Sequence, residues 1–128
     1  MKAEIKKIDL VDHNFASYWP DDIINFYVVV DVGLGPVGID ACEYFSLHVC
    51  SPSWFAMNNM SQPKFVRHFL FLEEYDDELI KSLVNRMVSE AERDTWRELG
   101  EYFSRYMKWE FEDYSESGDD IMPSFPFG

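Results

Sequence analysis

The sequence predicts an α+β domain: about four strands in a mainly antiparallel sheet, followed by two helices packed on one face of that sheet. Three observations support this class. Apolar residues alternate with a period of two through the first half of the chain, and their period changes to about 3.6 after residue 75. The 128 residues are enough for a single core, and an aromatic content of 17% is too high for a disordered chain. A run of strands followed by a run of helices is typical of α+β proteins.

The first three strands follow from the alternation of apolar residues. Residues 3–10 predict the first strand, and residues 22–34 show the strongest alternation in the chain. There, five apolar side chains share one face: Ile24, Phe26, Val28, Val30 and Val32. Residues 43–49 predict a third strand, with Phe45, Leu47 and Val49 on one face and Tyr44, Ser46 and His48 on the other.

Residues 64–75 predict a fourth strand. Apolar side chains occupy both odd and even positions, and therefore both faces of this strand. This indicates a central strand or one covered on both faces. The sheet would then consist of four consecutive strands, completed before the first helix begins.

Two helices are predicted after these strands. In residues 76–92 three apolar pairs repeat at helical spacing behind the N-cap candidates Asp76 and Asp77. The pairs are Leu79/Ile80, Leu83/Val84 and Met87/Val88. A second helix is predicted from Thr95 and Glu98, which have the spacing of a capping box. It carries Trp96, Leu99, Phe103 and Tyr106 at helical spacing.

The glycines in residues 31–40, DVGLGPVGID, match the G-x-G-x-x-G pattern of dinucleotide-binding loops. That pattern binds a pyrophosphate only where the glycines lead into a helix, with an acidic residue about 20 positions further on. Here they lead into another predicted strand, and the corresponding position is Asn58. We therefore expect no nucleotide cofactor, and predict that Gly33, Gly35 and Gly38 supply the positive φ angles of a hairpin connection.

Metal binding and catalysis have no clear signature in the sequence. The histidines His13, His48 and His68 lack ligand-type spacing. Residues 113–118 resemble the start of a calcium loop, but Ser124 stands where the bidentate glutamate is needed. The chain contains no nucleophile elbow and no P-loop. We expect a protein that is not an enzyme and needs no cofactor or metal.

The cysteines indicate a reducing compartment. If residues 42–50 form one strand, the Cα atoms of Cys42 and Cys50 lie about 26 Å apart, far beyond disulfide range. The chain also has no run of about 20 apolar residues and no N-terminal segment like a signal peptide. These features predict a cytoplasmic protein with two free thiols.

The charge is strongly acidic and unevenly distributed. The formal net charge is −13, and residues 73–128 carry 16 acidic residues against 6 basic ones. Such a field repels nucleic acid and anionic membranes, and it attracts a basic partner. Solubility alone would also explain an acidic composition.

The segment from residue 108 to 120 is the candidate recognition site. Trp109 and Phe111 would pin it to the domain, while the neighbouring carboxylates face outward. The predicted partner-binding residues are Glu110, Glu112, Asp113 and Tyr114, together with Trp54 as an aromatic anchor from another part of the chain. Two alternatives stay open: Trp109 and Phe111 are ordinary core residues, or the interface lies around Trp19, Trp54, Tyr44 and His48.

Several blocks, in this order, resemble the immunity protein 8 family. They are MKAEIKKID, YWPDD, NFYVVVDVGLGPVG, HVCSPSWF, FLEEYD, DTW and YMKWEFEDY. The resemblance covers residues 1–114, which we take as one domain, and leaves residues 115–128 as an acidic tail containing Pro and Phe. It implies a cytoplasmic α+β protein, encoded beside a polymorphic or contact-dependent bacterial toxin. Such a protein binds and neutralises the toxin's C-terminal domain without catalysis, and the charge predicts that this domain is basic.

Two other functions are compatible with the composition. One is an acidic nucleic-acid mimic, or a regulatory protein, that binds a basic host protein. The other is a small hydrolase with an unrecognised site, which would need a pocket with converging polar groups. A neighbouring gene for a large secreted toxin would favour immunity over the mimic.

Overall fold

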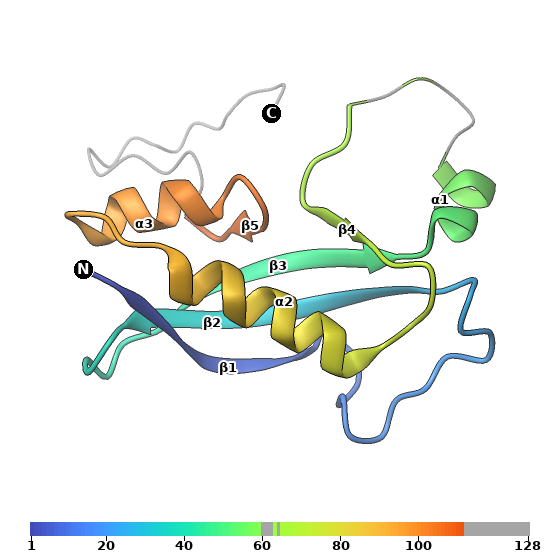
Figure 1. The fold of residues 1–128 in the computed structure, drawn as a ribbon, viewed down its shortest axis with the longest axis horizontal. Helices are drawn as coiled ribbons and strands as arrows, with labels where there is room; N and C mark the ends of the chain where they lie inside the picture. Colours follow the sequence, from blue (N-terminus) through green and yellow to red (C-terminus); the bar gives the residue numbers. More distant parts are fainter. Residues whose placement is uncertain (60–62, 64, 112–128) are drawn as a thin grey trace.

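A computed structural model describes residues 1–59, 63 and 65–111, and gives them a mixed sheet of five strands with three helices (Figure 1). The α+β class is confirmed, and two helices, residues 77–90 and 96–103, follow the main strands as predicted. The strands are β1 (Ala3–Leu10), β2 (Tyr27–Pro36), β3 (Glu43–Cys50), β4 (Phe69–Phe71) and β5 (Lys108–Trp109). The helices are α1 (Pro52–Asn59), α2 (Asp77–Glu90) and α3 (Trp96–Phe103).

The sheet has the order β1-β2-β3-β4, and β5 also pairs with β3. Strands β1, β2 and β3 form an antiparallel meander in which Val32 faces Ile8 on one side and Phe45 on the other. The outer edge of β3 is shared by two short strands. β5 runs antiparallel beside Phe45 and Ser46, and β4 runs parallel beside residues 48–50.

The predicted fourth strand is wrong in extent and position. Of the described residues 65–75, only Phe69–Phe71 are in a strand, and β4 is an edge strand parallel to β3, neither central nor antiparallel. A parallel neighbour needs a crossover connection. The chain between β3 and β4 supplies it and contains α1, a helix that the sequence analysis did not predict.

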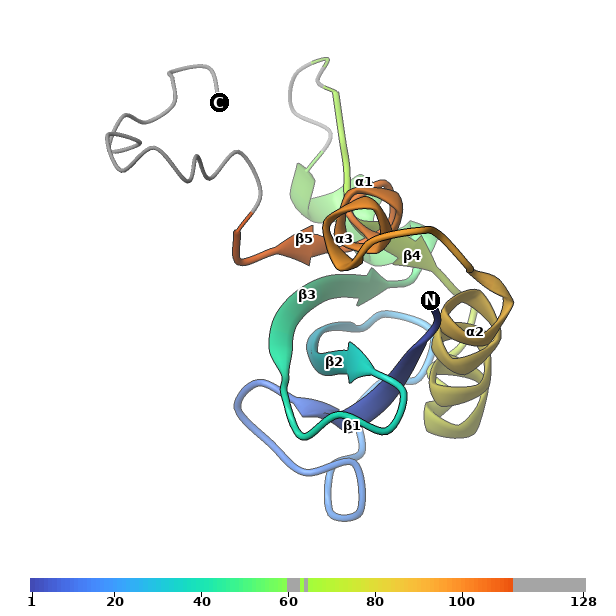
Figure 2. The same ribbon diagram turned by 90° about the vertical axis from the view of Figure 1, so that its left-hand side faces the viewer.

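One face of the sheet holds the core. The inward side chains of β2 and β3 pack with those of α2 and α3, and these side chains are almost fully buried: Val30, Val32, Phe45, Val49, Ile80, Val84, Leu99 and Phe103. Figures 1 and 2 show α2 running along β1 and α3 lying beside β5. The predicted alternation is confirmed from Phe26 to Val32, where the even-numbered side chains are buried. Ile24 precedes the strand and is exposed.

The predicted helix starts are confirmed. The carboxylate of Asp76 accepts the backbone N–H of Leu79, and the Thr95 hydroxyl accepts that of Glu98. Both residues are N-caps, which satisfy N–H groups that the first turn of a helix leaves without partners. α3 ends at Phe103, so Tyr106 lies in the turn that follows the helix.

The prediction for the glycines was right for one position and wrong for two. Gly38 has a φ of 80° in the connection between β2 and β3, but Gly33 and Gly35 lie within β2. Their role is steric. A Cβ on Gly35 would lie 1.9 Å from the carbonyl oxygen of Ala41, and one on Gly33 would lie 2.5 Å from Cys42 Sγ. Both cysteines are free thiols; Cys42 is exposed and Cys50 is buried.

Candidate functional site

Glu110 is the one predicted acidic site residue that the structure describes. It directly follows β5 and is exposed. Its N–H donates to the Tyr44 carbonyl at 3.1 Å, and its carboxylate accepts the Tyr44 N–H at 2.8 Å. Glu110 therefore extends the β3–β5 pairing, so part of its hydrogen-bonding capacity is used within the domain. Glu112, Asp113 and Tyr114 lie outside the described residues.

Trp109 pins this segment to the domain. Its side chain is 5% exposed and stacks on Phe45 with the ring centroids 5.9 Å apart. Its indole N–H donates to Glu43 Oε1 at 2.9 Å, and the indole N–H of Trp96 donates to the same oxygen at 2.9 Å. Phe111 meets Trp109 edge to face. Trp109 thus belongs to the core, in agreement with the alternative that it is an ordinary core residue.

Trp54 does not join Glu110 in one site. It lies on α1 and stacks on Tyr27 at 4.4 Å between ring centroids, with 11° between the planes. Tyr27 faces Cys50 at the end of β3, whereas β5 pairs near its beginning. Phe45 and Cys50 are five residues apart, which corresponds to about 16 Å along the strand.

A row of aromatic rings lies on the face of the sheet opposite the core. Trp54 stacks on Tyr27, Tyr27 on His48, and His48 on Phe69 at 4.7 Å. Phe71 continues the row, and Phe55 contacts both Phe69 and Phe71 edge to face. The face of Tyr44 and His48 was predicted from the sequence as an alternative interface, but these phenylalanines were not. Their alternation at positions 69 and 71 is the signal that could have revealed them.

The neighbours of His48 in this row determine its protonation state. Its Nδ1 lies 2.7 Å from the Tyr27 hydroxyl, which donates to it when the ring is neutral. Burial lowers the pKa of His48 below its usual value, and the nearby His68 lowers this pKa further. Burial, and to a lesser extent Cys50, raises the pKa of Tyr27. At neutral pH both side chains are therefore uncharged.

This arrangement predicts a specific pH dependence. A histidine whose pKa is lowered on folding stabilises the fold fully above its unfolded pKa of about 6.5, and this contribution is lost as the pH falls through the folded value. The melting temperature of the wild type minus that of His48→Gln is expected to be larger at pH 7.5 than at pH 5.5. Taking the difference cancels the titration of the other groups. An unchanged difference would contradict the neutral, partly buried state of His48.

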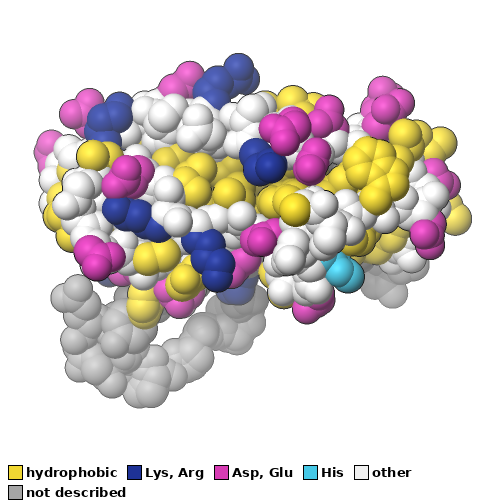
Figure 3. All heavy atoms as spheres, turned by 90° about the horizontal axis from the view of Figure 1, so that it is seen from below, with side chains coloured by type: hydrophobic (Ala, Val, Ile, Leu, Met, Phe, Trp, Pro, Cys, Tyr) yellow, Lys and Arg dark blue, Asp and Glu magenta, His cyan; other side chains and the backbone are white. Residues whose placement is uncertain are grey.

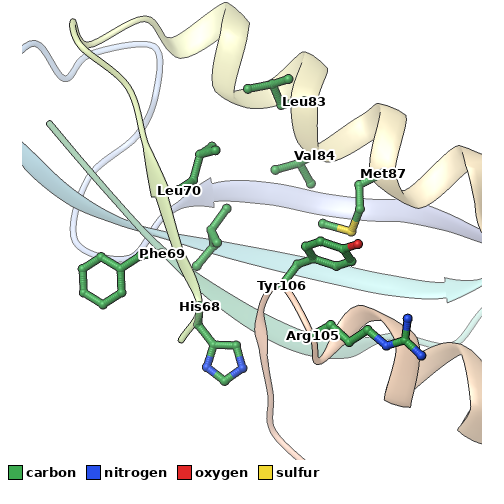
Figure 4. A pocket seen from close by; sticks show the side chains of 9 residues that line it. His68, Phe69, Leu70, Leu83, Val84, Met87, Arg105 and Tyr106 are labelled. Carbon is green, nitrogen blue, oxygen red and sulfur yellow. The ribbon is translucent and has the colours of Figure 1, made fainter. Parts of the chain in front are cut away.

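An apolar cavity lies on the other face of the sheet, among β4, α2 and the turn after α3 (Figure 4). It has a volume of about 230 Å³. Leu83, Val84 and Met87 line it from α2, and Arg105 and Tyr106 line it from the turn. The part of the chain that the structure describes places no carboxylate in the lining of this cavity. Among the described residues, no group of three or more His, Cys, Asp or Glu side chains could hold a metal ion.

Three segments converge at one end of the molecule, on the right in Figure 1, and we call them the acidic end. They are the loop of residues 11–26, helix α1, and residues 69–79. Figure 3 shows acidic side chains around exposed hydrophobic ones at this end. Trp19, which the sequence analysis named only in its alternative interface, is 63% exposed and packs edge to face on the buried Tyr75.

None of the helices in the described part of the chain has the length and apolar character needed to span a bilayer.

Comparison with known proteins gives one match. The family model described as immunity protein 8 matches residues 3–114. Neither the search of curated proteins nor the search of solved structures finds a match.

Proposed function

Because the chain belongs to the immunity protein 8 family, we propose that it binds a cognate bacterial toxin and neutralises it by protein–protein contact, without catalysis. The toxin is the C-terminal domain of a polymorphic or contact-dependent system encoded beside this protein. The complex forms in the cytoplasm of the producing cell, where the free thiols Cys42 and Cys50 are stable in a reducing environment.

The observation that carries this proposal is the extent of the family match, which spans residues 3–114 and so nearly all of the described chain. The surface gives further support. Exposed large apolar side chains such as Trp19, Met57 and Phe71 are typical of protein interfaces.

The charge supports a basic toxin domain. A protein of formal net charge −13 attracts a basic partner over long range and repels nucleic acid. Complementary fields raise association rates from about 10⁵–10⁶ M⁻¹s⁻¹ toward about 10⁸ M⁻¹s⁻¹. Fast association suits a protein that must bind each toxin molecule before that toxin acts. Neutralisation then occurs by occlusion of the toxin's active site or by binding beside it.

Co-expression tests the function. Cells that produce the C-terminal toxin domain encoded beside this gene are expected to grow when they also produce this protein, and the two chains are expected to co-purify in stoichiometric amounts. A toxin domain from an unrelated system is the control, and it should kill cells whether or not this protein is present. Killing by the cognate domain that this protein does not change would refute the proposal.

We also propose that the domain of residues 1–114 is sufficient for binding. A chain shortened to these residues should protect nearly as well as the full chain in the same assay. A complete loss of protection with the fold retained would place an essential contact in residues 115–128.

A further inference from the structure

We infer that the acidic end is the surface that binds the toxin, and that the toxin surface it fits has an apolar centre surrounded by Lys and Arg side chains. This inference rests on the proposed function and specifies the interface for it. It differs from the site predicted from sequence, which was centred on Glu110 and the residues after it.

Hydrogen bonds to backbone carbonyls hold the acidic end together. The Tyr75 N–H donates to the Ile23 carbonyl at 2.8 Å and joins the start of α2 to the loop of residues 11–26. The Ser53 hydroxyl donates to the Ile24 carbonyl at 2.6 Å and joins α1 to the same loop. Ile24, Pro52, Glu73 and Glu74 line one shallow hollow. The three segments therefore present one continuous surface.

The charge of this surface has one sign. Residues 11–26 and 69–79 contain eight carboxylates and no Lys or Arg, and α1 contains no charged residue. The carboxylates belong to Asp12, Asp21, Asp22, Glu73, Glu74, Asp76, Asp77 and Glu78. Lys81, one turn into α2, is paired with Glu78 at 3.5 Å and lies over the Phe15 ring. A partner with Lys and Arg at its rim matches this distribution.

Large apolar side chains stand among these charges. Trp19 and Ile24 are exposed on the loop, Met57 on α1, and Phe71 at the end of β4. Trp19 rests on Tyr75, which is itself only 3% exposed and also contacts Tyr18 and Phe26 edge to face. A tryptophan supported from below loses little conformational freedom on binding, and such aromatic anchors often dominate the binding energy.

Two buried polar atoms at this end lack a hydrogen-bond partner among the described residues. They are the Tyr75 hydroxyl oxygen and Asn25 Oδ1. Buried polar atoms without partners are uncommon in folded proteins. Asn25 Oδ1 can only accept, so the group that satisfies it is an N–H or O–H donor. A buried water molecule supplies such a donor at sites of this kind, so these two atoms do not by themselves identify the partner.

The end of the sheet near β5 lacks this combination. Lys108 lies beside Ser46, Lys7 lies beside Gly33, and both bring positive charge to the region around Glu110. The Glu110 carboxylate already accepts the Tyr44 N–H. A basic partner is therefore attracted less to this region than to the acidic end.

The role of the acidic-end carboxylates is tested by measuring how fast the full-length protein associates with the purified toxin domain. The variant Asp21→Lys/Glu73→Lys/Glu74→Lys avoids the capping residue Asp76. It is expected to associate at least tenfold more slowly at low salt and to depend less on salt. The matched control is Glu90→Lys/Glu92→Lys/Asp94→Lys, which makes the same change of net charge. It lies at and just beyond the far end of α2, about 20 Å away, and is expected to slow association by less than threefold.

The apolar centre is tested with a second matched pair. Phe71 and Tyr106 are each 45% exposed, but only Phe71 lies at the acidic end. Phe71→Ala is expected to raise the Kd at least tenfold, mainly through faster dissociation, and Tyr106→Ala to change it by less than threefold. Melting temperatures of all four variants identify any loss caused by unfolding.

The results separate the two proposals. If the wild type binds the toxin domain but the acidic-end variants and their controls behave alike, the inference is wrong and the proposed function stands. Slower association after Glu110→Lys alone, with the acidic-end variants unaffected, would place the interface at β5. If the wild type does not bind its cognate toxin domain, the proposed function fails and the inference fails with it.

Discussion

Replacing Trp109 by Ala is expected to lower the free energy of unfolding by about 3 to 5 kcal/mol, the range for a buried large aromatic side chain. The indole fills the space above Gly100, where an added Cβ would lie 2.5 Å from the ring. Its loss leaves a cavity beside Phe45 and removes one of the two N–H donors to Glu43 Oε1. Total stability of a domain is about 5 to 15 kcal/mol, so the variant would lose a large share of its stability.

Urea denaturation followed by circular dichroism measures this loss. Trp109→Phe is the informative companion, because it keeps an aromatic ring against Phe45 but lacks the indole N–H. Its loss is expected to be clearly smaller than that of the alanine variant. A change below about 0.5 kcal/mol for Trp109→Ala would contradict the buried position of the side chain, since exposed sites typically give changes of that size.

Replacing Gly35 by Ala is expected to cost about 2 to 3 kcal/mol, near the upper end of the range for overpacking. The new methyl group would lie 1.9 Å from the Ala41 carbonyl oxygen and 2.9 Å from Lys6 Cε. The lysine side chain can move, but the carbonyl belongs to the backbone that leads into β3. The end of β2 or the connection to β3 must therefore shift.

Gly38→Asn is the matched control for Gly35→Ala. Gly38 has a positive φ, but nothing lies within 4 Å of a Cβ at that position. Asn tolerates this left-handed conformation better than most residues, so a change of less than about 1 kcal/mol is expected. If both variants were equally stable in thermal and urea unfolding, the steric role of Gly35 would be wrong.

The main elements were predictable because each has a regular pattern of burial. β2 and β3 bury one face, so their apolar residues alternate, and α2 buries the stripe of Ile80, Val84 and Val88. The caps at Asp76 and Thr95 were also predictable, because capping depends on nearby residues alone.

The elements between residues 52 and 75 were not predictable in this way. α1 carries no apolar stripe, since its Trp54 and Phe55 are adjacent and only partly buried, while Met57 is exposed. The length of β4 was overestimated because the sequence around it is rich in residues that favour strands. Its actual length depends on the edge of β3, where β5 pairs with Phe45 and Ser46 and β4 pairs with only three residues.

The sequence located the acidic half of the chain but not the surface on which the charges gather. Asp12, Asp21 and Asp22 come from the first half, and they join the carboxylates of residues 73–78 only because the chain folds the loop of residues 11–26 against the start of α2. In the same way, Trp54 and Glu110 were placed in one predicted site but lie near opposite ends of β3. Pairings between distant segments of this kind leave no periodic signal in the sequence.

The most direct test of neutralisation by binding is to mix the purified toxin domain with this protein at ratios from one tenth to two equivalents. The free toxin is measured by size-exclusion chromatography, and the mass of both chains is measured by mass spectrometry. Neutralisation by binding predicts that the complex increases in proportion to the added protein and reaches completion at a fixed stoichiometry, with both masses unchanged. An altered toxin mass at one tenth of an equivalent, or no complex at any ratio, would contradict it.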